Sequence, residues 1–234
     1  MSHANALSLY HLLTIAHQDF LRKHPKTKKR HLHQYLEGGA LSAKHLQEFL
    51  DQSYQLDRNE SIDDFALDKQ LSTPTTAVYY NPKTNHAVVA HRGTQGALDW
   101  GNNAIYAVAG RAGYRQTKRY KDALKVQKDA EAKYGPQNIE TIGHSQAGLI
   151  AEEAGKDSKS IITVNKATSP FDPYATQNKN QVDVRSGTDP VSIWRPFFTS
   201  GSQSYNILPE SINPLTEHSH KILNRVNPSK MFGF

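Results

Sequence analysis

Apolar residues recur at helical spacing in two stretches before residue 60 of the 234-residue chain. In residues 5–21 the apolar positions share one face, which predicts an amphipathic helix that ends before Pro25. A second helix is predicted from Ser42 to Gln55, with Ser42 as its N-cap. The acidic stretch from Asn59 to Asp68 is interpreted as a loop.

Strand-like segments begin after residue 75. The segments 76–80 and 86–90 are rich in β-branched and aromatic residues and flank a turn at Asn81–Asn85, which predicts a β-hairpin. A long helix is predicted from Tyr114 to Tyr134, and a shorter one from Ser145 to Glu153. Further strands are predicted at Ile139–Ile142, Ile161–Val164 and Val182–Arg185.

This alternation of strands and helices predicts an α/β fold whose sheet is mostly parallel after the hairpin and is flanked by helices. We expect residues 1–70 to form a helical, basic N-terminal extension that packs on the core. Residues 71–234 would then form the α/β domain.

Composition excludes several classes of protein. No apolar run approaches the ~18 residues of a membrane-spanning helix. The first apolar stretch is interrupted by His11 and by His17 to Asp19, which disfavours a secretory signal, so we expect a cytoplasmic or peripheral membrane protein. Cysteine is absent, so thiol nucleophiles and cysteine-ligated zinc sites are excluded.

Net charge is +6, which favours anionic partners. A basic run from Arg22 to Arg30 contains six Lys/Arg and no acidic residue. With the preceding amphipathic helix it could anchor the chain on an anionic membrane surface, or it could be a solvated loop beside a helix that packs on the core. Nucleic acid is disfavoured as a partner, because no helix-turn-helix, zinc-finger or interleaved aromatic pattern is present.

The segment Gly143-His144-Ser145 lies between a predicted strand and a predicted helix. A nucleophile elbow needs this context, because small residues must flank a serine that projects from so tight a turn. Ala147 stands where the usual pattern has glycine, and Gly148 follows it. The alternative is a serine that only caps the helix. We interpret His144 as a packing residue of the turn.

A serine nucleophile needs a base and an acid that orients the base. In α/β-hydrolases the chain order is serine, acid, histidine. Asp189 follows a predicted strand, whereas Asp183 and Asp172 are more simply surface or turn acids. His218 and His220 are the only histidines after Ser145, so both are candidate bases.

Several of these segments together resemble the class 3, fungal-type lipases of the α/β-hydrolase superfamily, over roughly residues 75–220. The similar motifs are Val88-Val89-Ala90-His91-Arg92-Gly93-Thr94, Asp99-Trp100, Gly113-Tyr114, Gly143-His144-Ser145, Ile161 to Asn165 and Asp189-Pro190-Val191. His91 in place of phenylalanine and Ala147 in place of glycine depart from the family pattern.

The resemblance implies an α/β-hydrolase fold and a role for each matching residue. Ser145 would be the nucleophile and Asp189 the orienting acid, with His218 preferred over His220 as the base. The backbone N–H groups of Gln146 and Thr94 would form the oxyanion hole. The interval 99–112 would be a small lid or acyl-binding wall, or else a buried helix over the sheet.

The resulting hypothesis is a serine hydrolase that cleaves carboxylic esters of lipids, either acylglycerols or phospholipids, without a cofactor. Metal binding at His218-Ser219-His220 or His31-Leu32-His33 is disfavoured, because neither pair has a carboxylate cluster nearby. The alternatives are an inert lipase-like binding module and an amidase or peptidase with the same triad. An active site requires Ser145 within hydrogen-bonding reach of a histidine that is itself held by Asp189.

Overall fold

The computed structural model describes residues 41–93, 95, 110–168, 178–189, 191–192, 203–207, 209–211, 213–226 and 231–233. In these residues nine strands form one sheet in sequential order, β1 to β9. The strands are β1 (Ser61–Ile62), β2 (Phe65–Leu67), β3 (Thr76–Asn81), β4 (His86–His91), β5 (Ile139–His144), β6 (Ser160–Val164), β7 (Gln181–Ser186), β8 (Gln203–Ile207) and β9 (Met231–Gly233). The helices are α3 (Ala43–Ser53), α5 (Lys118–Tyr134), α6 (Ala147–Ala154) and α8 (Pro214–Glu217), with 3₁₀ turns η1 (Pro136–Asn138) and η2 (His220–Arg225).

The sheet is parallel in its centre and antiparallel at both sides. Strands β1 to β4 pair antiparallel, β4 to β8 pair parallel, and β9 pairs antiparallel with β8. The predicted hairpin is confirmed as β3 and β4, with Thr76 opposite His91. Helices α5 and α6 connect successive parallel strands, so the expected α/β-hydrolase-type sheet flanked by helices is confirmed.

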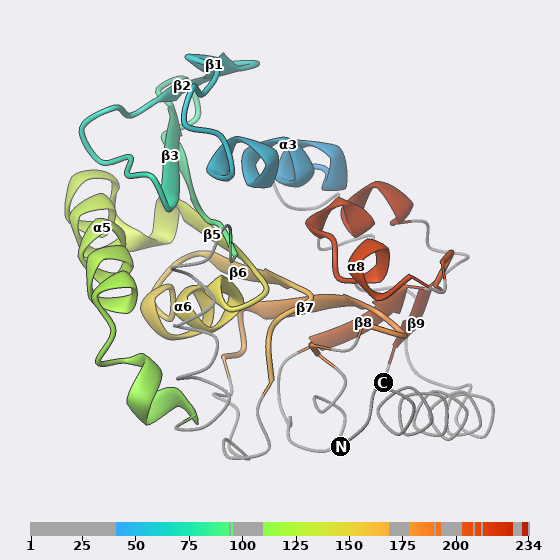
Figure 1. Ribbon diagram of the computed structural model, residues 1–234. Coiled ribbons are helices and arrows are strands. Elements are labelled where there is room, and N and C mark those ends of the chain that lie inside the picture. The colour runs from blue at the N-terminus through green and yellow to red at the C-terminus, as the bar shows by residue number, and fades with distance from the viewer. Residues whose placement is uncertain are drawn as a thin grey trace.

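Helices cover both faces of the sheet (Figure 1). Consecutive strand residues such as Val88 and Val89 lie in different apolar clusters, because successive side chains of a strand point to opposite faces of the sheet. The first cluster packs against α3 and η2, and the second packs against α5. The sheet is thus packed on both faces. Because β5, β6 and β7 are parallel, their carboxyl ends lie at the same edge of the sheet.

Helix α3 lies where the sequence predicts it. Ser42 has extended backbone angles, and its hydroxyl accepts a hydrogen bond from His45 N–H at 3.3 Å. Leu46, Phe49 and Leu50 are fully buried in the cluster with β3 and β4. Burial of each such side chain contributes about 1.5–3 kcal/mol, so α3 is an integral part of the core.

Helix α5 begins later than predicted. Thr117 has extended angles, and its hydroxyl accepts a hydrogen bond from Tyr120 N–H, so the helix starts at Lys118 rather than at Tyr114. Tyr114 is the last residue of a separate helical segment, described over 110–114, and is buried against Tyr120. The helix ends at Gly135, whose φ of 80° suits glycine.

The prediction of a loop from Asn59 to Asp68 is wrong, because this stretch contains β1 and β2. Ile62 and Phe65 are buried, while Asp63 takes a positive φ in the turn between the strands. Strands this short, separated by acidic turn residues, give no alternation to detect. Strands β8 and β9 were not predicted either.

Several predicted features lie outside the described residues. They are the helix at 5–21, the basic run 22–30, His31 and His33, and nearly all of the interval 99–112. No helix in the described ranges is long and apolar enough to cross a bilayer.

Candidate active site

Ser145 lies in a sharp turn between β5 and α6. Its φ is 57°, an uncommon value for a residue with a side chain, and its N–H donates to Val164 O on β6 at 2.9 Å. A Cβ at Gly143 would lie 2.3 Å from Ala147 O, so only glycine fits there. The strand, turn and helix thus have the geometry of a nucleophile elbow.

The glycine at position 148 is explained by the neighbouring Lys166. A Cβ at Gly148 would lie 2.8 Å from Lys166 Cγ, so the lysine stem occupies the space beside this glycine. Ala147 is fully buried in the cluster with Leu149. The turn therefore closes with alanine at the position where the usual motif has glycine.

The structure brings Ser145, His218 and Asp189 together in one hydrogen-bonded line. His218 Nε2 lies 2.8 Å from Ser145 Oγ, and His218 Nδ1 lies 2.8 Å from Asp189 Oδ1. A carboxylate accepts from Nδ1–H, which leaves Nε2 of the neutral ring to accept from the serine hydroxyl. This is the arrangement in which a histidine can take the proton of a serine nucleophile.

Asp189 follows β7 and is almost fully buried. Besides His218, its carboxylate accepts hydrogen bonds from Val191 N–H at 3.2 Å and from the N–H and hydroxyl of Ser192. These donors compensate the charge for its loss of water and fix the plane of the carboxylate. The loop after β7 therefore presents Asp189 in one orientation.

The backbone around His218 is held at three consecutive carbonyl groups. Asn165, which follows β6 with a φ of 44°, donates from Nδ2 to Glu217 O at 2.8 Å and to Ser219 O at 3.1 Å. His144 Nε2 lies 2.7 Å from His218 O. The sequence did not identify Asn165 as a site residue, because nothing in a single asparagine shows which loop it holds.

Glu217 fixes the same segment from its other side. Its buried carboxylate accepts from Ser186 Oγ and from Arg225 Nη1, and also from the N–H groups of Glu210 and Ser211. His218 thus lies between Glu217, whose carboxylate these hydrogen bonds hold, and Ser219, the N-cap of η2.

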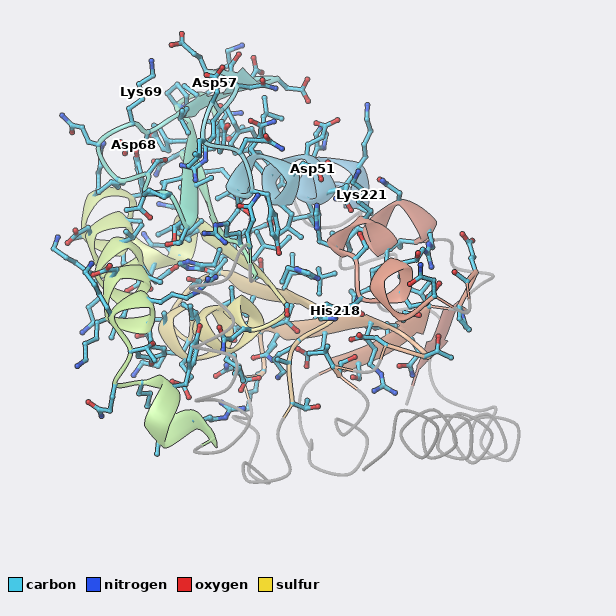
Figure 2. All side chains as sticks on the ribbon, viewed as in Figure 1. Asp51, Asp57, Asp68, Lys69, His218 and Lys221 are labelled. Atoms are coloured by element: carbon cyan, nitrogen blue, oxygen red, sulfur yellow. The ribbon has the colours of Figure 1, made fainter. Side chains whose placement is uncertain are left out.

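His220, the other candidate base, lies elsewhere. Its Nε2 is 2.8 Å from Asp51 Oδ1, and its ring stacks on Tyr54 with centroids 4.5 Å apart. Burial raises and His220 lowers the pKa of Asp51, and the net direction is downward. Figure 2 shows Asp51 on α3, above the position of His218.

The other acids considered are not beside Ser145 within the described ranges. Asp183 lies within β7, where its carboxylate accepts from Thr163 Oγ1 and from Gln181 Nε2. Asp172 lies outside the described residues. In the described part of the chain, no group of three or more histidine, aspartate or glutamate residues could hold a metal ion.

Of the two expected oxyanion-hole residues, Gln146 is described and Thr94 is not. Gln146 immediately precedes α6, so its N–H lies at the N-terminal end of that helix, next to Ser145. Gly93, the residue before Thr94, lies two positions beyond the end of β4. A Cβ at Gly93 would lie 2.6 Å from Tyr54 Oη and 2.9 Å from His144 Nδ1, so this position is also restricted to glycine.

Two buried arginines fix the end of β4. Arg119 donates from Nη2 to the carbonyl oxygens of Arg92 and Gly93, and Arg92 donates from Nη1 to Gly93 O at 3.0 Å. The strand end beside Ser145 is therefore rigidly placed.

Comparison with known proteins gives few matches. No family model matches the chain. No curated protein matches it. Among solved structures, it is similar to a triacylglycerol lipase from Penicillium expansum, with 13% identity and a TM-score of 0.43, and the match covers 81% of each chain.

Proposed function

We propose that this protein is a serine hydrolase that cleaves carboxylic esters of lipids. The observation that carries the proposal is the line from Ser145 through His218 to Asp189 at the carboxyl edge of a parallel sheet. A binding module has no need for a serine in a left-handed turn with a buried acid behind the histidine. The geometry therefore favours the enzyme over the inert module.

Ester cleavage follows from the donors and acceptors in this line. Ser145 Oγ attacks the ester carbonyl carbon while His218 Nε2 takes the hydroxyl proton. The Asp189 carboxylate, hydrogen-bonded to Nδ1, stabilises the imidazolium that forms. The N–H of Gln146 donates to the carbonyl oxygen as it becomes negative, and loss of one such donor typically costs ~10²–10³ in turnover.

Collapse of the tetrahedral intermediate releases the alcohol, which leaves with the proton from His218. Water then attacks the acyl-enzyme, again with His218 as base, and frees the acid and Ser145. No step needs a metal or an organic cofactor. The lipid part of the proposal is supported by the resemblance of the motifs and by the net charge of +6, which favours anionic lipid surfaces.

Hydrolysis of short- and long-chain p-nitrophenyl esters by wild type and Ser145→Ala, with and without vesicles of an anionic phospholipid, tests this function. We expect Ser145→Ala to lose at least ~10⁴-fold in kcat, because the nucleophile is removed. Long-chain hydrolysis by the wild type should rise with vesicles. Ser160→Ala is a matched control, because this buried hydroxyl has no hydrogen-bond partner in the described part of the chain.

Equal activity of Ser145→Ala and wild type would contradict the assignment. A wild type that is inactive on every ester would favour the inert module instead. Activity on short esters alone, with no response to vesicles, would support a serine esterase and contradict the lipid surface.

A further inference from the structure

Tyr54, the residue at the end of α3, connects two parts of the site. Gly93 N–H donates to Tyr54 Oη at 2.7 Å, and Tyr54 Oη lies 2.5 Å from His144 Nδ1. The other ring nitrogen of His144 lies 2.7 Å from the carbonyl oxygen of His218. A continuous chain of hydrogen bonds therefore runs from the end of β4 through Tyr54 and His144 to the backbone of His218.

The direction of each bond in this chain is fixed by chemistry. A carbonyl oxygen only accepts, so His144 Nε2 carries the hydrogen. Burial, together with the nearby His218 and His220, holds the pKa of His144 well below its ordinary value, so the ring is neutral and Nδ1 accepts. Tyr54 must then donate to Nδ1, and its oxygen is left to accept from Gly93 N–H.

The Tyr54 ring is held in place from its other face. His220 stacks on it at an interplanar angle of 10° and bonds to Asp51, one turn earlier on α3. Helix α3 thus contacts the segment around His218 through two side chains. Through His144, the Tyr54 hydroxyl fixes the His218 carbonyl that lies between the two carbonyls bonded by Asn165.

We propose that Tyr54 is a positioning residue of the hydrolase. Acting through His144, it sets the height of the His218 ring over Ser145, and the hydrogen bond that its oxygen accepts from Gly93 N–H holds the hydroxyl in place. This inference rests on the proposed function. It also assigns His144 a role beyond packing in the elbow, since both ring nitrogens are bonded.

The substitution Tyr54→Phe removes the hydroxyl and keeps the ring that stacks on His220. We expect kcat for ester hydrolysis to fall about 10-fold, because small misplacements of a general base reduce turnover strongly. The KM should stay within about twofold, since transition-state rather than ground-state alignment is lost.

Tyr79→Phe is the matched control. Tyr79 is fully buried, packs on Phe49 of α3, and donates its hydroxyl hydrogen to Asn59 O at 2.8 Å, so its loss also weakens the α3 side of the core by one hydrogen bond. We expect its kcat to stay within about twofold of wild type. Thermal unfolding of both variants shows whether they lose stability equally.

A double-mutant cycle with His144→Phe tests the path. If Tyr54 acts through His144, Tyr54→Phe lowers kcat by less than twofold in the His144→Phe background. A full 10-fold effect in that background would overturn the path. An unchanged kcat in Tyr54→Phe, a change confined to KM, or an equal loss of kcat in Tyr79→Phe would overturn the positioning role.

A separate readout keeps this inference distinct from the proposed function. Long-range ¹H–¹⁵N NMR of histidine-labelled protein reports the tautomer of His144, assigned by the signals missing in His144→Phe. We expect hydrogen on Nε2, and an Nδ1 shift that changes in Tyr54→Phe. If wild type has no Ser145-dependent activity, the proposed function fails, and an NMR signal unaffected by Tyr54→Phe would overturn the hydrogen-bonded chain itself.

Discussion

At the scale of single residues, two histidines two positions apart have different surroundings. His218 lies between Ser145 Oγ and Asp189 Oδ1, whereas His220 bonds to Asp51 on α3. The segment changes from α8 to η2 here, so consecutive side chains leave it in different directions. Chain order could not separate them, because both follow Ser145, and only the resemblance to the lipase motifs favoured His218.

This difference predicts a large loss of activity when His218 is replaced and a much smaller loss when His220 is replaced. His218→Ala should lower kcat by about 10⁴-fold or more, because neither proton transfer nor Asp189 can then assist the serine. His220→Gln keeps a polar group within reach of Asp51 and should retain at least about a tenth of the activity. Steady-state ester hydrolysis of the two purified variants measures both effects, and a greater loss in His220→Gln would contradict the placement of the base.

The residues that could be predicted from the sequence are those whose role depends on local context. Ser145 lies between strand β5 and helix α6, and Asp189 follows strand β7. The neighbouring sequence was therefore enough to propose both residues. Tyr54, by contrast, bonds to Gly93 and His144, which lie 39 and 90 positions further along the chain. Asn165 bonds to Glu217, 52 positions away. No spacing rule connects such partners, so only the folded structure identifies them.

At the scale of the elements, α6 contacts the sheet through buried charges as well as apolar residues. Glu152 on α6 accepts hydrogen bonds from Lys166 Nζ and from Gln181 Nε2, and Arg111 Nη1 lies 2.5 Å from its carboxylate. Burial raises the pKa of Glu152, but the charges of Lys166 and Arg111 outweigh it and hold the pKa well below its ordinary value. The carboxylate is therefore charged inside the protein and depends on its partners.

Lys166→Met keeps the stem that packs beside Gly148 and removes the ammonium. We expect the free energy of unfolding to fall by about 3 kcal/mol, because a buried carboxylate loses one of its two cationic partners. Lys118→Met removes a lysine from an exposed pair with Asp122 and should cost less than about 1 kcal/mol. Urea unfolding of both variants measures the difference, and equal losses would contradict the dependence of α6 on this buried pair.

The elements that could be predicted from the sequence are those long enough to show a helical or alternating pattern of apolar residues. Helix α3 and the hairpin of β3 and β4 have clear helical or alternating patterns, and both lie within two residues of their predicted bounds. Strands β1, β2 and β9 have two or three residues each, which is too short for any pattern. Their pairing depends on neighbours in the sheet rather than on their own sequence.

At the scale of the whole molecule, the two faces of the sheet differ in chemistry. The face toward α3 is an apolar cluster that includes Ile142, Ile162 and Val182. The opposite face has an apolar cluster as well, which includes Val89, but Thr141 on this face bonds to Gln127 of α5 and to Ser158 after α6, and Thr163 bonds to Asp183. The alternation of strands and helices predicted a sheet flanked by helices, but it did not show that side-chain hydrogen bonds would hold part of one face.

His91 belongs to this polar side and replaces the phenylalanine of the lipase pattern. Its Nδ1 lies 2.9 Å from Thr76 Oγ1 on the paired strand, and its Nε2 lies 3.4 Å from Gln127 Oε1 on α5. Burial lowers the pKa of His91 to about 4, the hydrogen bond to Gln127 opposes this, and the charge of Arg119 adds to it. The ring is therefore neutral in the folded protein at pH values where it is protonated in the unfolded chain.

Because the pKa of His91 is lower in the folded protein than in the unfolded chain, the free energy of unfolding depends on pH. The unfolded state binds the extra proton between about pH 6.5 and pH 4, so the contribution of His91 is complete above this range and is lost as the pH falls through it. His91→Gln removes the titration and keeps hydrogen-bonding groups for Thr76 and Gln127. Between pH 6.5 and 4.5, the free energy of unfolding should fall by about 2 kcal/mol less in the variant than in wild type. Urea unfolding at a series of pH values measures both slopes, and parallel slopes would show that His91 is protonated in the folded protein.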